Sequence, residues 1–152
     1  MKIYIDMDGV IADFRGWIKQ HIPDINEDMW RNSDIPWKFM SDNYTECYLT
    51  LEHLHFLEYA DYLYNNLSDV KFLTALPKEW WDNTKGEIAM LNKTTWLENH
   101  INNFNADDVI FTPSASAKLK YAGLGTVLYD DREDTIHAWN KTGGIGVLVK
   151  GQ

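Results

Sequence analysis

The sequence predicts an α/β fold in which helices cover both faces of a parallel sheet. Two observations lead to this prediction: short β-prone runs recur along the chain, and segments with helical spacing of apolar residues separate them. The β-prone runs lie at 2–5, 70–73, 109–111, 126–129 and 145–149. The helical patterns cover about 79–101, 114–122 and 134–140. Strand and helix therefore alternate along most of the chain.

The first strand is followed by an acidic turn and then by a helical pattern. Val10, Ile11, Phe14, Trp17 and Ile18 recur at the spacing of one helix face. The segment 23–67 interrupts the alternation, because it begins irregularly and then becomes helical over 51–67. We interpret 23–67 as a small helical cap inserted after the first strand-helix unit. The core then consists of 1–22 and 68–152.

The composition excludes several classes of protein. The 152 residues, 45% of them hydrophobic, suffice for one domain with an ordinary core. The 14 Lys and Arg against 23 Asp and Glu give a net charge of -9, which disfavours a nucleic-acid polymer as partner. The single cysteine, Cys47, excludes an internal disulfide framework and a thiolate metal cluster.

The distribution of apolar residues predicts a cytoplasmic protein that does not enter a membrane. Asp6 and Asp8 interrupt the first apolar stretch before it reaches the roughly 7 residues of a signal-peptide core. No stretch approaches the roughly 18 uninterrupted apolar residues of a membrane span. The oligomeric state stays open, and a homodimer is compatible with the sequence.

Polar residues follow the β-prone runs, where an open parallel sheet binds its ligands. Asp6 and Asp8 follow the first run, Thr74 follows the second, and Asp130 follows the fourth, with Lys118 shortly ahead of it. Carboxylates gathered at neighbouring strand ends repel one another unless a cation lies among them. Mg²⁺ suits this set, because it prefers oxygen ligands and binds one or two carboxylates together with substrate phosphate.

These residues resemble the four motifs of the haloacid dehalogenase (HAD) superfamily of phosphotransferases. The motifs are Asp6-Met7-Asp8-Gly9-Val10, Thr74 after Phe72-Leu73, a downstream lysine, and Asp130-Asp131. Within that superfamily, the stretches 6–14 and 129–134 and the late Gly143-Gly144-Ile145-Gly146 resemble the 5′(3′)-deoxyribonucleotidase family and its bacterial and phage relatives. The resemblance implies a Rossmann-like core with a small cap.

The resemblance also implies roles for individual residues. Asp6 would attack phosphorus and form an aspartyl-phosphate, while Asp8 would protonate the leaving oxygen and later activate water. The metal ligands would be the carboxylates of Asp6 and Asp130 and the backbone carbonyl of Asp8. Thr74 would donate its hydroxyl to a phosphoryl oxygen, and Lys118 would neutralise the transferring group. Asp131 is expected to orient water or the lysine.

The spacing leaves a choice between two lysines and among several aromatic residues. Lys118 is favoured over Lys120 for the transferring group, and Lys120 is assigned to substrate binding. Phe14 is expected to wall a nucleoside pocket, as in the family. Trp37 is the first choice for the residue that stacks on the base, because aromatic faces hold a base with little regard to its identity. The other candidates are Trp30, Phe39 and Tyr44.

These expectations describe a Mg²⁺-dependent phosphatase that acts on (deoxy)ribonucleoside monophosphates. Two alternatives stay open at this point. The first is a related phosphatase that acts on another small phosphomonoester, such as a sugar phosphate, or on a nucleic-acid 3′ end. The second is a nucleotide-binding module without catalytic activity, although the presence of both Asp6 and Asp8 argues against it.

Overall fold

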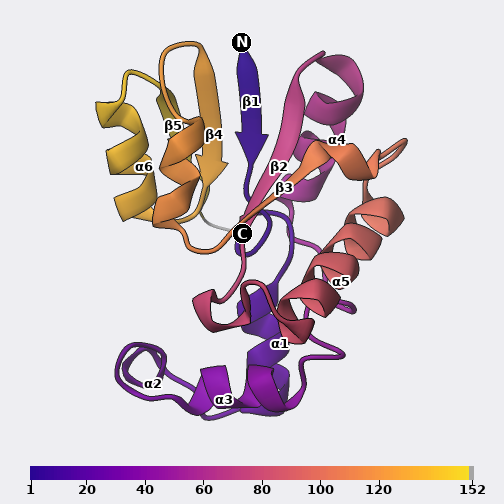
Figure 1. Cartoon of the computed structure of the whole chain (residues 1–152), viewed down its shortest axis with the longest axis vertical. Helices are drawn as coiled ribbons and strands as arrows, with labels where there is room; N and C mark the ends of the chain where they lie inside the picture. The colour runs from indigo at the N-terminus through magenta and orange to yellow at the C-terminus, as the bar shows by residue number, and fades with distance from the viewer. Residues whose placement is uncertain (151–152) are drawn as a thin grey trace.

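The computed structural model describes residues 1–150 and contains one five-stranded sheet. The strands are β1 (Lys2–Ile5), β2 (Val70–Ala75), β3 (Val109–Thr112), β4 (Thr126–Asp130) and β5 (Ile145–Leu148). They are ordered β3-β2-β1-β4-β5, and every neighbouring pair is parallel. The predicted α/β fold with a parallel sheet is confirmed, and β1 lies at its centre (Figure 1).

Helices lie on both faces of the sheet and beyond the carboxyl ends of its strands (Figure 1). The α-helices are α1 (Phe14–His21), α2 (Glu27–Asn32), α3 (Ile35–Asp42), α4 (Phe56–Asn66), α5 (Thr84–His100) and α6 (Glu133–Lys141). Three short 3-10 helices complete the described chain: η1 (Lys78–Trp80), η2 (Ala106–Asp108) and η3 (Ser116–Tyr121). None of the helices in residues 1–150 combines the length and the apolar character that a membrane crossing needs.

The alternation of side chains along the strands divides the core into two layers. On one face, Ile5 and Phe72 pack with residues of α1, α4 and α5. On the other face, Tyr4 and Leu128 pack with Trp139 of α6, and η3 lies against the same layer. The three inner strands β1, β2 and β4 therefore bury residues on both faces, which explains their nearly continuous apolar runs in the sequence.

Several predicted helices begin or end at different residues in the structure. The pattern that starts at Val10 becomes helical only at Phe14, because Val10 belongs to a turn and Asp13 caps the helix by accepting from the backbone N–H of Gly16 at 3.0 Å. The pattern over 79–101 divides into η1 and α5, with Asn83 as the N-cap of α5. The pattern over 114–122 forms the 3-10 helix η3.

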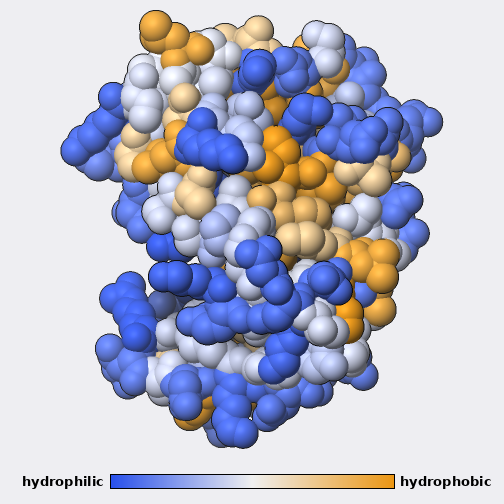
Figure 2. Space-filling view, in the orientation of Figure 1, coloured by the Kyte–Doolittle hydropathy of each residue, from blue (hydrophilic) through white to orange (hydrophobic). Residues whose placement is uncertain are grey.

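The segment 23–67 contains two parts with different surroundings. Its last helix, α4, contacts β2, and Ala60 and Leu63 of this helix are buried in the core. Helices α2 and α3 instead lie with α1 beyond the carboxyl ends of the strands (Figure 1). Figure 2 shows that hydrophilic residues cover most of the visible surface of this helical part. From here on, the helical cap means residues 14–50, which contain α1, α2 and α3; compared with the predicted segment 23–67 it adds α1 and leaves out α4.

The helical cap is joined to α5 by hydrogen bonds from side chains of that helix. The amide Nδ2 of Asn92 donates to the carbonyl oxygens of Thr45 and Cys47, at 3.1 Å each. The indole Nε1 of Trp96 donates to the carbonyl oxygen of Leu51 at 2.8 Å. These contacts hold the segment 45–51, which leads from the cap back to the core, against α5.

Candidate functional site

Three carboxylates meet at the carboxyl edge of the sheet. Asp6 follows β1, and Asp130 ends β4, which is the neighbour of β1. Asp6, Asp130 and Asp131 each place one carboxylate oxygen in a common group, and the three oxygens lie within 4.8 Å of one another. Asp6 and Asp130 are buried, with 6% and 0% of their surface exposed. The parallel pairing of β1 and β4 therefore brings together residues that are more than a hundred positions apart.

Lys118 lies between two of these carboxylates. Its Nζ is 2.9 Å from Oδ1 of Asp6 and 2.9 Å from Oδ2 of Asp130. Burial lowers the pKa of the Lys118 ammonium, but the two carboxylates outweigh burial and raise this pKa above its ordinary value. The 3-10 helix η3 turns the side chain of Lys118 inward and leaves Lys120 exposed.

The three carboxylates repel one another in spite of Lys118. Burial raises the pKa of Asp6 well above its usual value, Lys118 opposes this, and the charges of Asp130, Asp131 and Asp8 add to it. Burial, followed by the charge of Asp130, raises the pKa of Asp131 to about 6. A divalent cation relieves such repulsion, and three oxygen donors without nitrogen or sulfur suit Mg²⁺. The donor set therefore fits the predicted metal. Asp131, which was expected to orient water or the lysine, joins Asp6 and Asp130 in this set, and the predicted contribution of the Asp8 backbone carbonyl stays a prediction.

Gly9 lets the carboxylate of Asp131 come close to the loop after β1. The φ angle of Gly9 is +82°, a conformation that L side chains rarely adopt. A Cβ at this position would also overlap the carboxylate of Asp131. The loop therefore needs glycine for its backbone conformation and for the space that Asp131 occupies.

Asp8 is held by a buried lysine that the sequence analysis missed. Nζ of Lys93, in α5, donates to Oδ2 of Asp8 at 3.0 Å, to Oγ1 of Thr74 at 2.7 Å and to the carbonyl oxygen of Ala75 at 3.0 Å. The same Nζ lies 4.3 Å from the centroid of the Tyr48 ring. Lys93 is completely buried, and the other oxygen of Asp8, Oδ1, is buried without a hydrogen-bond partner among the described residues.

Thr74 and the carboxylate of Asp8 both contact Lys93, and their predicted roles toward phosphate and metal stay predictions. Thr74 is fully buried, does not line the cavity described below, and accepts from Lys93. The carboxylate of Asp8 faces Lys93 and is not a member of the carboxylate group formed by Asp6, Asp130 and Asp131. A sequence signal for Lys93 exists, because this residue lies four positions after buried Ala89 and four before buried Leu97. A lysine on the buried stripe of a helix needs a partner.

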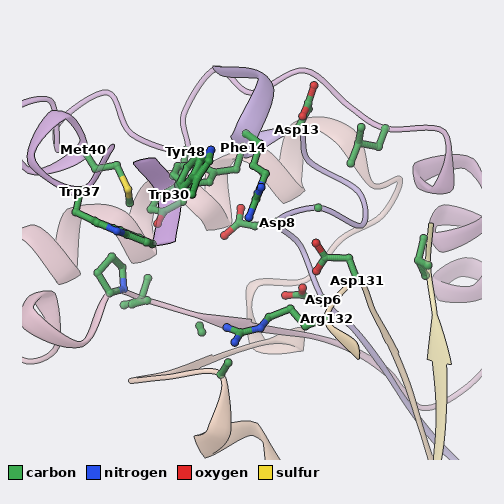
Figure 3. A pocket seen from close by; sticks show the side chains of 18 of the residues that line it. Asp6, Asp8, Asp13, Phe14, Trp30, Trp37, Met40, Tyr48, Asp131 and Arg132 are labelled. Carbon is green, nitrogen blue, oxygen red and sulfur yellow. The ribbon is translucent and has the colours of Figure 1, made fainter. Parts of the chain in front are cut away.

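A cavity of about 880 Å³ opens between the carboxylates and the helical cap. Figure 3 shows Asp6, Asp131 and Arg132 at one end and the rings of Trp30 and Trp37 at the other. Phe14, Met40 and Tyr48 also line the cavity. The rings form a connected series, with centroids 5.3 Å apart for Phe14 and Tyr48, 6.2 Å for Phe14 and Trp30, and 5.8 Å for Trp30 and Trp37.

The structure brings some of the predicted substrate-binding residues to this cavity and not others. Phe14 and Trp37 line it, and Trp37 is 49% exposed. Lys120 does not line it, because its ammonium is turned toward the ring of Tyr121, 5.3 Å from the centroid. The substrate-binding assignment of Lys120 therefore stays a prediction without support from the cavity lining. Phe39 and Tyr44 face Trp17 and Lys85, respectively, and lie outside the lining.

Comparisons with known proteins support the fold. No protein-family model and no curated protein sequence matches the chain. Among solved structures, the chain is similar to a hydrolase from Streptococcus pneumoniae TIGR4, with a TM-score of 0.51 and 12% sequence identity. The similarity covers 98% of this chain and 92% of the other chain. At this identity, the likeness describes the arrangement of the whole chain in space.

Proposed function

We propose that this protein is a metal-dependent hydrolase that releases phosphate from nucleoside monophosphates, and that it belongs to the HAD phosphatases. The observation that carries the proposal is the position of Asp6. Its carboxylate follows the central strand, contacts Lys118 at 2.9 Å and lines the cavity. A nucleophile, a cation and a ligand-sized cavity therefore meet at one place.

The carboxylates of Asp6, Asp130 and Asp131 would hold the metal ion. A bound Mg²⁺ neutralises charge on these carboxylates and on the phosphate of the substrate. Lys118 supplies a fixed positive charge at the same place, as positioned cations do in phosphoryl transfer. This arrangement lets an anionic substrate approach Asp6 although the chain as a whole carries a net charge of -9.

The reaction would proceed in two steps at Asp6. In the first, Oδ of Asp6 attacks phosphorus, the bond from phosphorus to the ester oxygen breaks, and Asp8 gives that oxygen a proton. In the second, water attacks the phosphorus of the aspartyl-phosphate, Asp8 takes a proton from it, and Asp6 is released with inorganic phosphate. Lys93 is a positioning residue in this scheme, because it fixes Oδ2 of Asp8 at 3.0 Å and leaves Oδ1 without a hydrogen-bond partner among the described residues.

The aromatic lining supports a substrate that carries a base. Phe14, Trp30, Trp37 and Tyr48 offer several ring faces or edges to the cavity. Each stacked base contributes about 1–3 kcal/mol on aromatic platforms of this kind. The hydrolase name of the solved structure with a similar fold agrees with hydrolytic chemistry.

Release of inorganic phosphate from a panel of phosphomonoesters tests the proposal. The panel contains deoxynucleoside and nucleoside monophosphates and sugar phosphates, each with Mg²⁺ or with EDTA. We expect Mg²⁺-dependent release, highest with nucleotides, and its loss in Asp6→Asn. Asp24→Asn, the same change at an exposed position of the cap, is the matched control and should behave as wild type. Full activity of Asp6→Asn would overturn the proposal, and so would the absence of release from every compound.

A further inference from the structure

All three arginines of the chain line the cavity. The sequence contains only Arg15, Arg31 and Arg132, and each of them is a lining residue together with Lys150. The arginines are therefore gathered at one cavity, although the whole chain carries a net charge of -9. Arginine presents a planar fork of donors that matches phosphate oxygens in pairs, so its position is informative about an anionic ligand.

Two of the arginines lie on the helical cap and share one acidic partner. Nη1 of Arg15 is 2.5 Å from Oε1 of Glu27, and Nε of Arg31 is 3.8 Å from Oε2 of the same glutamate. The two guanidinium groups therefore share one ion-pair partner. The side chains of Arg15 and Arg31 are 61% and 77% exposed, so their remaining donors are open to a ligand.

Aromatic residues of the cavity lie beside the cluster of Arg15, Glu27 and Arg31. The guanidinium carbon of Arg15 lies 4.8 Å from the centroid of the Trp30 ring, and Trp30 meets Trp37 edge to face at 5.8 Å. A base held against these rings would bring the rest of a nucleotide close to Arg15. The transferring phosphate is met elsewhere, by Lys118 at the sheet edge.

The arginine on the sheet side is also oriented from outside the cavity. Nη2 of Arg132 is 3.0 Å from Oδ2 of Asp134, which does not line the cavity. Nζ of Lys150 is 2.5 Å from Oε1 of Glu133, which does not line it either. Both basic side chains are more than half exposed, at 56% and 60%. Basic groups therefore face the cavity from the sheet side and from the cap side.

We propose that the substrate carries a second phosphate group, which Arg15 and Arg31 bind at the cap end of the cavity. The substrate class is a nucleoside bisphosphate: one phosphate at Asp6, the base against Trp30 and Trp37, and the other phosphate at the arginine pair. This inference rests on the proposed phosphatase function and adds a second anion site to it. It gives the cap a role in selecting substrates by charge.

The test compares kcat/KM for a deoxynucleoside 3′,5′-bisphosphate and for the corresponding 5′-monophosphate. We expect wild type to prefer the bisphosphate by roughly tenfold or more, the value of one charge-assisted hydrogen bond. In the double variant Arg15→Gln, Arg31→Gln, the ratio of the two kcat/KM values should fall to near one. Lys38→Gln removes one positive charge from α3 outside the cavity and is the matched control, expected to keep the wild-type ratio.

Two outcomes overturn the second anion site: a ratio near one in wild type, or an unchanged ratio in the double variant. If wild type hydrolyses neither compound, the proposed phosphatase function fails, and calorimetric titration of the two compounds into wild type decides the anion site separately. Tighter binding of the bisphosphate that is lost in the double variant would then support it. Equal binding of both compounds would refute it.

Discussion

The two ends of the cavity hold their charged groups in different ways. At the sheet end, Asp6, Asp130 and Lys118 are nearly or completely buried, and Lys118 lies within hydrogen-bond distance of both carboxylates. At the cap end, Arg15 and Trp37 are about half exposed and lie on short helices. A buried charge without its partner is costly, whereas an exposed charge is screened by water. Changes at the sheet end should therefore affect stability and catalysis together, and changes at the cap end should affect substrate binding alone.

The largest effect should come from Lys118→Met. This change leaves two buried carboxylates without their cation, so the free energy of unfolding should fall by about 3–5 kcal/mol. Phosphate release should fall by at least about 100-fold, because a positioned positive charge is lost. Urea unfolding and initial rates measure the two effects. Lys120→Met, two residues away and exposed, is the control. An equal loss of stability and activity in both variants would show that Lys118 has no specific role in the site.

Lys93→Met should have the next largest effect. It removes three hydrogen bonds from a fully buried ammonium, to Asp8, Thr74 and Ala75. We expect kcat to fall by roughly 100-fold, within the range that general acid-base catalysis contributes, while KM changes little. Lys78→Met, an exposed lysine of η1, is the control. A rise in KM with an unchanged kcat would contradict the positioning of Asp8 by Lys93.

Magnesium should stabilise the protein through the sheet end. A ligand that binds only the folded state at about 100 times its Kd adds roughly 2.7 kcal/mol. Thermal unfolding with and without Mg²⁺ measures this gain, which should be lost in Asp130→Asn. Asp107→Asn, an exposed residue of η2, should keep the gain. Equal stabilisation of all three proteins would place the ion somewhere else.

The smallest effect on stability should come from Trp37→Ala at the cap end. Because Trp37 is 49% exposed, the free energy of unfolding should change by less than about 1 kcal/mol. Nucleotide binding should weaken by about 1–3 kcal/mol, and KM should rise accordingly. Leu91→Ala, an exposed apolar residue of α5, is the control for nonspecific loss. A large loss of stability in Trp37→Ala would show that side chains at the cap end stabilise the fold as much as those at the sheet end.

The sheet end was the part of the candidate site that the sequence could predict. Asp6 and Asp130 each follow a β-prone run, and parallel strands place such residues at one edge. Spacing alone could not separate Lys118 from Lys120, because residues two apart on a helix face different directions and the packing of η3 decides which of them points inward. The sequence does not predict the role of Lys93, because its contacts depend on how α5 packs against β2 and the cap.

The cap end was harder to predict for a physical reason. Its helices α2 and α3 contain no more than eight residues each, and several of their aromatic side chains are only partly buried. Periodicity places a residue on a helix face but does not say what a short helix faces. Phe14 and Trp37 were predicted on the cavity, whereas Tyr48 was not, because its position depends on a backbone φ of 72° in the chain after α3.

Asp6 attacks phosphorus in the proposed mechanism, and trapping the product of that attack tests this step. Protein mixed with Mg²⁺ and a deoxynucleoside monophosphate is quenched in acid within one turnover, digested, and analysed by mass spectrometry. We expect one phosphoryl group on the peptide that contains Asp6 in wild type and none on that peptide in Asp6→Asn. A phosphoryl group on another residue, or none on the peptide during active turnover, would contradict it.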